Sequence, residues 1–561
     1  MGERYRETAC TSLQQVLIEA AEKHGELTIG FVESNGEIQD IRYDQLFRNA
    51  KKILTALRER GLREGDYLIL ASDSNKRTIS FFWAAVLGGI IPTILQPPVS
   101  FNSHNPAAEK LYSVYDLLNQ PCLILPSSLK DTHFEHIDKG QIIYDNICFE
   151  NLSEGVTTAS KPEDTAYIQF SSGSTGNPKG VMLSHENLLT NADSIAEGLK
   201  LSSLDCTANW MPLYHDMGLI GYHITPIYYS HYQIHIETID FIKNPFLWLQ
   251  AMSERKVNIS GCPNFGLALV NRHMLRKDPG NIDLSNLRGL LNGAEPISPE
   301  IMEQFIENFR KYGFRENAMM PVYGMAEATL AITFNPIGTK PIVTTFKRYC
   351  LVKNNAARIY NGSMEETQRI VSVGKPLSGV EISIQSRKGD ILRDGMVGEI
   401  CVKGKSVFQG YFRDKDKPES KNKNEWFRTG DQGFILMDDL YITGRYKDII
   451  FINGSNYYAN DLEATAIREC DLVYGKFIIG GYHDEKKGHD SIIAFMVGSD
   501  NQATRSKCKE VGSYFLNKLG IPISNFVLVR SNQIPKTSSG KIKRYKIIQA
   551  FQGGELKEIS I

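Results

Sequence analysis

Apolar residues follow helical spacing in some segments of the chain and form short continuous runs in others. Residues Gln45 to Arg58 show the helical spacing, which predicts an amphipathic helix. Tyr67 to Ala71 and Thr93 to Leu95 are apolar runs that predict buried strands, with a helix over Ile79 to Leu87 between them. Because helices and buried strands alternate in this way along most of the chain, we expect an α/β fold with partly parallel sheets.

The strongest apolar run is too short to cross a membrane. It covers 15 residues, from Phe81 to Leu95, and contains Gly88, Gly89 and Pro92. A membrane helix needs about 20 predominantly apolar residues. We therefore expect a buried helix that turns into a buried strand, and no stable insertion into a membrane.

A domain boundary is expected near Gly444. Leu440 to Thr443 and Ile449 to Ile452 both have strand-like sequences, and the segment between them is polar. The part of the chain that follows is long enough to fold as a small domain. We expect a large N-terminal body over residues 1–444 and a smaller C-terminal domain over residues 445–561.

The charge balance argues against nucleic acid or an anionic membrane as the main partner. The 561 residues contain 63 Lys+Arg and 64 Asp+Glu, which gives a formal net charge of −1. Apolar residues make up 42% of the chain and charged residues 23%, values that exclude a disordered or fibrous protein.

The nine cysteines are scattered along the chain, and no CxxC pair occurs. This pattern predicts reduced thiols and gives neither a disulfide framework nor a zinc knuckle. Residues Met1 to Gln14 lack an apolar core, so we expect no signal peptide. Together these features predict a cytoplasmic protein.

A segment rich in glycine and hydroxyl groups follows a predicted strand at Asp164 to Phe170. Ser171 to Gly180 (SSGSTGNPKG) is expected to be a loop, with a capped helix beginning at Ser184. Backbone N–H groups, hydroxyls and a lysine together suit phosphate oxygens. The alternative is an ordinary surface turn, and the spacing does not match a Walker loop. The candidate phosphate contacts are Ser171, Ser172, Gly173, Ser174, Thr175, Gly176 and Lys179.

Four further motifs follow this loop in a fixed order. They are PVYGMAEATL at 321–330, WFRTGDQG at 426–433, GRYKDIIFING at 444–454 and PKTSSGKIKR at 535–544. With residues 171–180, they resemble the motifs of the adenylate-forming superfamily, which includes acyl-CoA synthetases, peptide-synthetase adenylation domains and luciferases. The resemblance spans residues 12–550. It implies layered α/β subdomains in the N-terminal body and a mobile α+β C-terminal domain that pivots near Lys447.

Within this superfamily, the chain is most similar to the fatty acyl-AMP ligase branch. The similar segments are WMPLYHDMGLIG at 210–221, SGCPNF at 260–265 and NGAEPI at 292–297, together with Ala326. Residues 346–370 lie where this branch carries an inserted motif. The resemblance implies ATP and Mg²⁺ as cofactors, a fatty acid as substrate and an acyl carrier protein as acceptor. Two alternatives stay open: an acyl-CoA synthetase that uses free coenzyme A, and a nucleotide-binding regulator with a degenerate site.

The same resemblance implies a role for individual residues. Lys541 would be the catalytic cation, and Glu327 would bind Mg²⁺, which commonly takes only one or two protein carboxylates. Asp431 would accept hydrogen bonds from the ribose hydroxyls, and Arg445 would reach ribose or phosphate. The adenine would lie on a backbone shelf and face a turn, formed by Asn292, Gly293, Ala294 and Glu295 and by Tyr323, Gly324, Met325 and Ala326.

His215 and the aromatic residues that follow it can be interpreted in two ways. Several histidines lie near His215 in sequence, but no HExxH or His-x-His spacing occurs, so we expect no zinc site. The resemblance instead implies that His215 borders the acyl carboxylate. Aromatic residues between Tyr222 and Trp248, and Phe265, could belong to the core or line an acyl channel.

Overall fold

The computed structural model describes residues 10–101, 105–134, 136–172, 178–363, 366–413, 425–452, 455–484, 489–537 and 541–559. Several predicted features therefore lie outside the described residues. These are Gly173, Ser174, Thr175 and Gly176 of the phosphate motif, residues 453–454 of the hinge motif, and residues 538–540 before Lys541.

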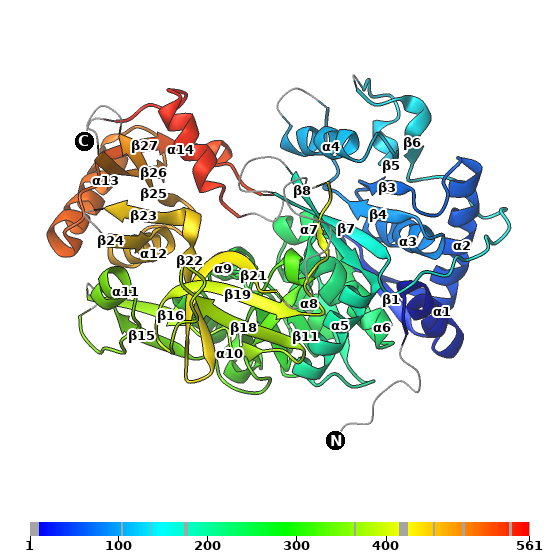
Figure 1. Ribbon diagram of the computed structural model, residues 1–561, viewed down its shortest axis with the longest axis horizontal. Coiled ribbons are helices and arrows are strands. Elements are labelled where there is room, and N and C mark those ends of the chain that lie inside the picture. The colour runs from blue at the N-terminus through cyan, green and yellow to red at the C-terminus, as the bar shows by residue number, and fades with distance from the viewer. Residues whose placement is uncertain are drawn as a thin grey trace.

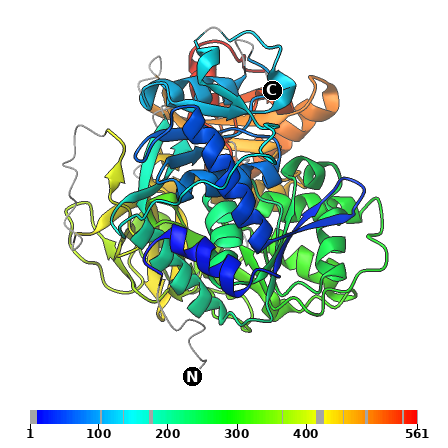
Figure 2. The same cartoon turned by 90° about the vertical axis from the view of Figure 1, so that its right-hand side faces the viewer.

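The large body, drawn in blue to yellow in Figures 1 and 2, contains a nine-stranded sheet. Six adjacent strands run parallel, and antiparallel strands close both edges. Buried parallel strands of this kind account for the short apolar runs of the sequence. In spatial order the strands are β17 (Lys375–Pro376), β14 (Ala331–Phe334), β13 (Met319–Gly324), β12 (Gly289–Asn292), β11 (Ile259–Gly261), β9 (Cys206–Asn209), β10 (Tyr232–Ile236), β1 (Thr28–Val32) and β2 (Ile38–Arg42).

A second, fully parallel sheet lies near the N-terminal helices. It consists of β4 (Ile91–Ile94), β3 (Tyr67–Leu70), β5 (Cys122–Leu125) and β6 (Ile142–Tyr144). The predicted amphipathic helix is confirmed as α2 (Tyr43–Glu59). The predicted helix of the apolar run is confirmed as α3 (Asn75–Leu87), which begins earlier than expected because the Ser74 side chain caps it through the Arg77 N–H.

The apolar run turns from helix to strand at Gly88, which packs against α2. A Cβ atom on Gly88, the C-cap of α3, would lie 2.4 Å from Leu54 Cδ1 of α2, so a larger residue there would displace the Leu54 side chain. β4 follows directly and pairs with β3. No helix among the described residues is long and apolar enough to cross a membrane.

The predicted phosphate loop is shorter than the sequence suggested. Strand β7 (Thr165–Ser172) continues through Ser171, and β8 (Pro178–Ser184) begins at Pro178, because Ser171 pairs with Lys179 across a hairpin. The expectation of a loop over the whole of Ser171 to Gly180 is therefore wrong at both ends. The helix start at Ser184 is confirmed: its side chain caps α5 (His185–Leu199).

The remaining helices of the large body connect and cover these strands. They are α1 (Leu13–Lys23), α4 (Pro106–Leu117), α6 (Thr225–Tyr228), α7 (Thr238–Lys243), α8 (Phe246–Glu254), α9 (Asn264–Met274), α10 (Pro299–Arg310) and the π-helix η3 (Met217–Ile224). A four-stranded antiparallel sheet of β18 (Val380–Gln385), β19 (Gly398–Gly404), β21 (Phe427–Leu436) and β22 (Asp439–Arg445) leads toward the C-terminal domain. The short strand β20 (Gly410–Tyr411) pairs with β8.

The segment expected to be an insertion forms a hairpin with a helix in its connection. The hairpin strands are β15 (Val343–Lys347) and β16 (Thr367–Val371), and α11 (Arg348–Asn354) lies between them in sequence. Phe346 is fully buried, with its ring centroid 5.1 Å from that of Phe434 and 5.5 Å from that of Tyr441. This segment therefore packs on the large body, against β21 and β22.

The C-terminal part of the chain has an α+β fold with its own apolar cores, and it is drawn in orange and red in Figure 1. Its strands are β23 (Ile449–Ile452), β24 (Ser455–Tyr458), β25 (Phe477–Asp484), β26 (His489–Val497) and β27 (Asn525–Val529); its helices are α12 (Ala459–Glu469), α13 (Gln502–Tyr514) and α14 (Arg544–Gln552). The predicted combination of a large layered body and a smaller C-terminal domain is confirmed. The boundary between residues 444 and 445 stays a prediction.

A buried polar network joins α3 to the main sheet. Trp83 Nε1 donates to His223 Nε2 at 2.8 Å, and His223 Nδ1 lies 2.8 Å from Gln233 Oε1. Gln233 Oε1 also lies 2.8 Å from His235 Nε2, and Gln233 Nε2 donates to Tyr43 Oη at 3.1 Å. Burial lowers the pKa of His223 to about 4, so its ring is neutral in the folded protein near neutral pH.

We predict that His223→Gln weakens the pH dependence of stability. Below its ordinary pKa of 6.5, the unfolded histidine takes up a proton that the folded ring, with a pKa of about 4, does not. The stability that comes from the neutral ring is therefore complete above pH 6.5 and is lost as the pH falls toward 4, by at most about 1.4 kcal/mol per pH unit. Denaturant titrations at pH 7 and pH 5.5 should show a fall in the free energy of unfolding that is smaller in the variant by about 1 kcal/mol.

His133→Gln is the matched control, since this ring is exposed. It should show the same fall in stability as the unchanged protein. If the free energy of unfolding fell by the same amount in His223→Gln as in the unchanged protein, the His223 ring would have to take up its proton in the folded state as readily as in the unfolded state.

Candidate functional site

A cavity of about 2630 Å³ lies between the large body and the C-terminal domain. Polar residues predicted from the motifs and a set of apolar side chains both line it. The predicted residues in its lining are Ser171, Lys179, His215, Ala294, Glu295, Tyr323, Gly324, Met325, Ala326, Glu327, Asp431, Arg445 and Lys541. Their roles in binding or catalysis stay predictions.

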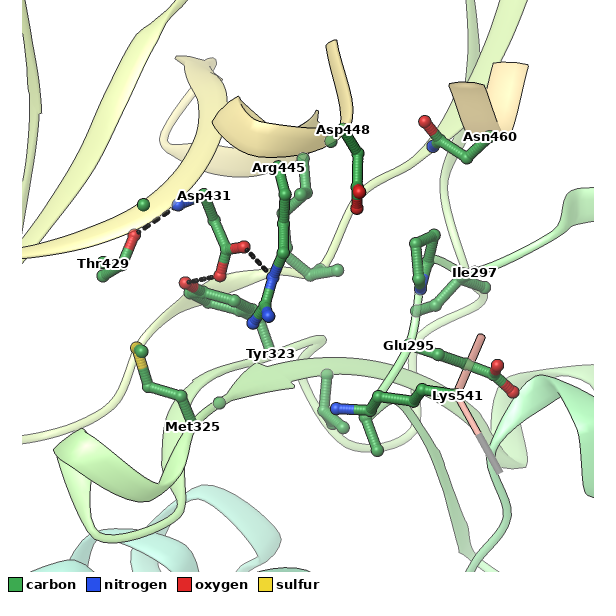
Figure 3. A pocket seen from close by; sticks show the side chains of 18 of the residues that line it. Glu295, Ile297, Tyr323, Met325, Thr429, Asp431, Arg445, Asp448, Asn460 and Lys541 are labelled. Carbon is green, nitrogen blue, oxygen red and sulfur yellow. Dashed lines mark hydrogen bonds and ion pairs between the residues drawn. The ribbon is translucent and has the colours of Figure 1, made fainter. Parts of the chain in front are cut away.

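Asp431 is a buried acceptor in the lining of the cavity, next to Tyr323 and Arg445 (Figure 3). Tyr323 Oη donates to Asp431 Oδ2 at 2.8 Å, and Arg445 Nε donates to Asp431 Oδ1 at 2.8 Å. The pairing of β21 with β22 sets Asp431 directly opposite Arg445. Thr429 Oγ1 accepts the Asp431 backbone N–H at 3.1 Å and fixes the turn before it.

The pKa values of both partners of Asp431 are raised, in part by its negative charge. The Asp431 carboxylate raises the pKa of the Arg445 guanidinium, although the Arg445 side chain is still 59% exposed. Burial, and next the Asp431 charge, raise the pKa of the Tyr323 hydroxyl well above its ordinary value. Tyr323 is therefore a neutral donor and Arg445 a permanent cation, so both can hold an ionised carboxylate.

Lys541 enters the same cavity from the C-terminal domain (Figure 3). Its backbone N–H donates to Thr537 Oγ1 at 3.0 Å, and the Thr537 N–H donates to the Lys541 carbonyl at 2.7 Å. Burial lowers the pKa of the Lys541 ammonium, and the Arg445 charge lowers it further. Three carboxylates act in the opposite direction: Asp216, Glu295 and Asp431. Three carboxylates of the large body therefore favour the charged form of the Lys541 ammonium.

The shelf predicted for adenine is held by close backbone packing. A Cβ atom on Gly293 would lie 2.7 Å from Val322 Cγ2, and Ala294 adopts a left-handed backbone with φ 68°. Asn292 is buried beneath the shelf, where its Nδ2 donates to the Cys262 carbonyl at 2.8 Å. Non-glycine residues with positive φ need support from their surroundings and often occur at functional sites.

Glu295 connects the shelf to other elements. Its Oε1 accepts the Phe265 N–H at 2.6 Å, and its Oε2 accepts the Tyr474 hydroxyl of the C-terminal domain at 3.4 Å. Burial raises the pKa of Glu295, although the Phe265 N–H and the Lys541 charge offset part of this effect. Glu295 therefore contacts both halves of the molecule.

Glu327 and Lys179, which lie far apart in the sequence, meet through Tyr411. The Tyr411 hydroxyl donates to Glu327 Oε1 at 2.8 Å, and Lys179 Nζ lies 4.8 Å from the centroid of the Tyr411 ring. Tyr411 is the last residue of β20, and it pairs with Val181 of β8. Glu327 is a carboxylate that could hold a Mg²⁺ ion, which would supply positive charge to phosphate oxygens.

His215 lines the cavity next to Asp216. Its Nδ1 is 2.7 Å from Asp216 Oδ1, and the Met217 N–H donates to the same carboxylate oxygen at 2.7 Å. Burial alone would raise the pKa of Asp216, but His215 and Lys541 lower it below its ordinary value. Among the described residues, no cluster of three or more His, Cys, Asp or Glu side chains could hold a metal ion.

The aromatic stretch divides between core and cavity. Phe241 and Trp248 are fully buried core residues, whereas Tyr222 and Phe265 line the cavity. Sequence reasoning missed Tyr411 and Tyr474, which contact predicted site residues from distant segments. Neither carries a local signal, because β20 has only two residues and Tyr474 lies in a turn.

Known proteins resemble this chain over nearly its whole length. The medium-chain-fatty-acid–[acyl-carrier-protein] ligase JamA of Moorena producens is 30% identical over 552 residues, covering 93% of this chain and 91% of the relative. The 4-hydroxyphenylalkanoate adenylyltransferase of Mycobacterium marinum is 28% identical over 554 residues, covering 93% and 87%. A solved structure from work on fatty acyl-adenylate ligases of E. coli and L. pneumophila has a TM-score of 0.87 and 28% identity, and the match covers 98% of this chain and 99% of that one.

A family model described as AMP-binding enzyme matches residues 17–412. The matched region includes the β7–β8 hairpin, the shelf at Ala294 and both Tyr323 and Glu327. It covers well over half of the sequence. The chain belongs to the AMP-binding enzyme family.

Proposed function

We propose that this enzyme activates a fatty acid as its acyl-AMP, with release of pyrophosphate, and passes the acyl group to the phosphopantetheine of an acyl carrier protein. The observation that carries the proposal is the cavity in which Asp431, Tyr323 and Arg445 of one bonded cluster face Lys541 of the C-terminal domain. The similarity to a carrier-protein ligase and to fatty acyl-adenylate ligase structures supports the same reaction.

The first half-reaction joins two anions. A fatty acid is ionised at neutral pH, so it needs no general base. One carboxylate oxygen attacks the α-phosphorus of ATP, the bond to the β-phosphate oxygen breaks, and pyrophosphate leaves. The protein must therefore hold the reactants in line and stabilise negative charge, which the Lys541 ammonium, Arg445 and Lys179 would supply.

The nucleotide contacts follow from the same geometry. The Asp431 carboxylate would accept both ribose hydroxyls, while Tyr323 and Ala294 would border the adenine. Glu327 would hold Mg²⁺, since a single protein carboxylate next to phosphate oxygens and water meets the usual needs of this ion. When bound, Mg²⁺ would neutralise phosphate charge. His215 would border the acyl carboxylate at the entrance to the apolar part of the cavity.

The second half-reaction requires the C-terminal domain to move, and we propose that the inserted segment limits this movement. Arg348 of α11 donates to Asp461 of α12 at 2.8 and 3.1 Å and to Thr465 at 2.9 Å. The Arg348 and Asp461 side chains are only 7% and 6% exposed. A buried, bidentate ion pair is costly to break on one side only, so it resists separation of the two helices.

A second contact connects the same elements. Glu300 of α10 lies 3.2 Å from Arg369 of β16 and 3.7 Å from Arg468 of α12. The inserted segment, the large body and the C-terminal domain thus share two ionic contacts. A restricted domain would favour a carrier-bound thiol over free coenzyme A, because the transfer geometry would be reached only with the carrier's binding energy.

The main alternative is an acyl-CoA synthetase. The two functions are separated by supplying enzyme, ATP and fatty acid with equal concentrations of coenzyme A and a phosphopantetheinylated carrier, and measuring both acyl thioesters by mass spectrometry. We expect the acylated carrier protein to be the main product. Rapid acyl-CoA formation at a comparable rate would favour the alternative.

We also propose that the protein works in the cytoplasm. All nine cysteines lie in the part of the chain that the structure describes, and none of them forms a disulfide. Reduced thiols are the usual state in that compartment.

Lys541→Ala should slow acyl-AMP formation by about a hundredfold or more, because it removes a cation from the developing phosphate charge. Transfer of the acyl group from supplied acyl-AMP should continue. Both rates can be measured by quench-flow with labelled fatty acid. Lys546→Ala, at an exposed lysine of α14, is the control and should leave both rates unchanged. Equal loss of both steps in Lys541→Ala would contradict the assigned role.

Replacing both Arg348 and Asp461 by alanine should raise the ratio of acyl-CoA to acylated carrier protein among the products by roughly fivefold or more. The reason is that the double variant removes the ionic contact without leaving one charge buried alone. The control is the double variant of Arg77 and Asp145, whose ion pair lies within the large body. An unchanged product ratio in the first variant would mean that this contact does not restrict the domain.

We propose the domain boundary at residues 444/445, with Lys447 as the pivot. Lys447 lies in a single turn of 3-10 helix, Tyr446–Asp448, between β22 and β23. Proline fixes φ near −65° and would prevent the large dihedral change that a pivot must absorb. Lys447→Pro should therefore impair one half-reaction at least tenfold more than the other. Lys447→Ala is the control. An equal loss of rate in both half-reactions of Lys447→Pro, relative to this control, would place the pivot elsewhere.

A further inference from the structure

A lysine to which the motifs assign no role lies beside the predicted phosphate hairpin. Lys110 belongs to α4, and its Nζ donates to the Phe170 carbonyl of β7 at 2.9 Å in a bond that is only partly buried. Ser171, the next residue, begins the predicted phosphate motif and pairs with Lys179 of β8. Lys110, Ser171 and Lys179 all line the cavity. The Lys110 ammonium is therefore placed where phosphate oxygens are expected.

Apolar packing fixes α4 against this hairpin. Leu111, Val114 and Tyr115 of α4 are buried in one cluster with Phe170 of β7. Residues three and four apart lie on one face of a helix, so a single face of α4 makes this contact. Lys110 lies one turn before Val114 and thus at the edge of the same face. The core therefore sets the backbone position of Lys110.

A second lysine reaches the cavity from the C-terminal domain. Lys543 lies directly before α14 and lines the cavity, as Lys541 does. Ile542, between them, forms a β-bridge with Lys536, and side chains alternate along an extended chain. Lys541 and Lys543 therefore project from the same side, about 6.6 Å apart at the rise of a strand. The helices α4 and α14 belong to different halves of the molecule (Figure 1).

Lys110 and Lys543 bring like charges together from the two halves. Burial, and next the Lys543 charge, lower the pKa of the Lys110 ammonium to about 8, so most of it is still protonated at pH 7. Burial and the neighbouring Lys546 lower the pKa of Lys543, whereas Glu109 of α4 raises it. Among the described residues, no carboxylate forms an ion pair with either ammonium.

Both ammonium groups therefore lack the partner that a half-buried cation needs. An ammonium has three N–H donors, and the Phe170 carbonyl takes only one of those of Lys110. Taking a charge out of water without an opposite charge is unfavourable, and charge-assisted hydrogen bonds to phosphate are among the strongest in proteins. A polyphosphate between the two lysines would compensate both.

We propose that Lys110 and Lys543 bind the two phosphates that leave as pyrophosphate, and that repulsion between the two lysines opens the domains once pyrophosphate has left. This inference rests on the proposed acyl-AMP formation. The charges that act on Lys541 include Arg445 and Asp431, whereas those that act on Lys543 include Glu109 of α4. Lys543 thus lies farther from the ribose side of the cavity, as the β- and γ-phosphates would.

A bound polyphosphate changes the sign of this contact between the domains. With phosphate oxygens between them, both ammonium groups are attracted to the same anion, and the closed arrangement is stabilised. Without the anion the two like charges repel, and the closed arrangement loses stability. Release of pyrophosphate would therefore favour the domain movement that the second half-reaction requires.

The test measures closure directly, with inorganic pyrophosphate and Mg²⁺ as the probe and no fatty acid present. Fluorophores at two exposed positions, Ser128 of the large body and Ser506 of the C-terminal domain, report the distance between the domains by energy transfer. They are attached through non-canonical residues, so that the native cysteines stay unlabelled. Pyrophosphate should shift the unchanged protein toward the closed population.

Lys110→Met should change closure in two opposite ways. Without pyrophosphate the variant should be more closed than the unchanged protein, because one of the repelling charges is gone. The pyrophosphate concentration that gives half-maximal closure should nevertheless rise by roughly tenfold or more, because a charged hydrogen-bond donor is lost. Lys543→Met should behave in the same way. Lys110→Arg keeps the positive charge and should keep the response.

Lys52→Met is the matched control. Lys52 of α2 also donates to a backbone carbonyl, that of Glu150 at 2.6 Å, but it lies outside the lining of the cavity. This variant should keep both the unliganded distance and the response to pyrophosphate. A merely structural role of the Lys110 bond would not make the unliganded protein more closed.

The outcomes separate this inference from the function on which it depends. Closure of Lys110→Met at the same pyrophosphate concentration as the unchanged protein would overturn the inference and leave acyl-AMP formation intact. An unliganded Lys110→Met that is no more closed than the unchanged protein would also overturn it. Failure of the unchanged enzyme to activate any fatty acid would overturn the proposed function, and with it the role of this site in pyrophosphate release.

Discussion

The arrangement of the site depends on one buried carboxylate. Asp431 is 5% exposed, and an ionised group at such a position must be compensated by hydrogen bonds and by an opposite charge. Tyr323 supplies the hydrogen bond from the main sheet, and Arg445 supplies the charge from the last residue of β22. Because β22 leads into the C-terminal part of the chain, the contacts that satisfy Asp431 also hold the end of this strand beside the main sheet. Lys541 then reaches the same cavity from the C-terminal domain.

Much of the fold could be predicted from local patterns in the sequence. The apolar spacing of α2 and the Ser184 cap of α5 both depend on neighbours in the chain. The ordered motifs also identified the main polar residues of the cavity, such as Asp431 and Lys541. These features were accessible because each is carried by a short, continuous segment with its own chemistry.

The features that the sequence did not reveal depend on pairs of distant residues. Tyr411 meets Glu327 only because a two-residue strand pairs with β8, and Arg348 meets Asp461 only when two domains pack together. The phosphate motif was expected to be a loop throughout, but pairing of Ser171 with Lys179 extends the strands at both ends. No single sequence contains the register of such contacts, since register is set by the partner strand and by the packing of the sheet.

The central claim is that the charges collected in the cavity promote attack of a carboxylate on the α-phosphate of ATP. The most direct measurement follows the oxygen atoms of a fatty acid labelled with heavy oxygen in its carboxylate, through one full turnover with a phosphopantetheinylated carrier. The account predicts that one labelled oxygen appears in AMP, because the acyl–phosphate linkage is later cleaved on the acyl side. Label found in orthophosphate, with ADP as the nucleotide product, would contradict it.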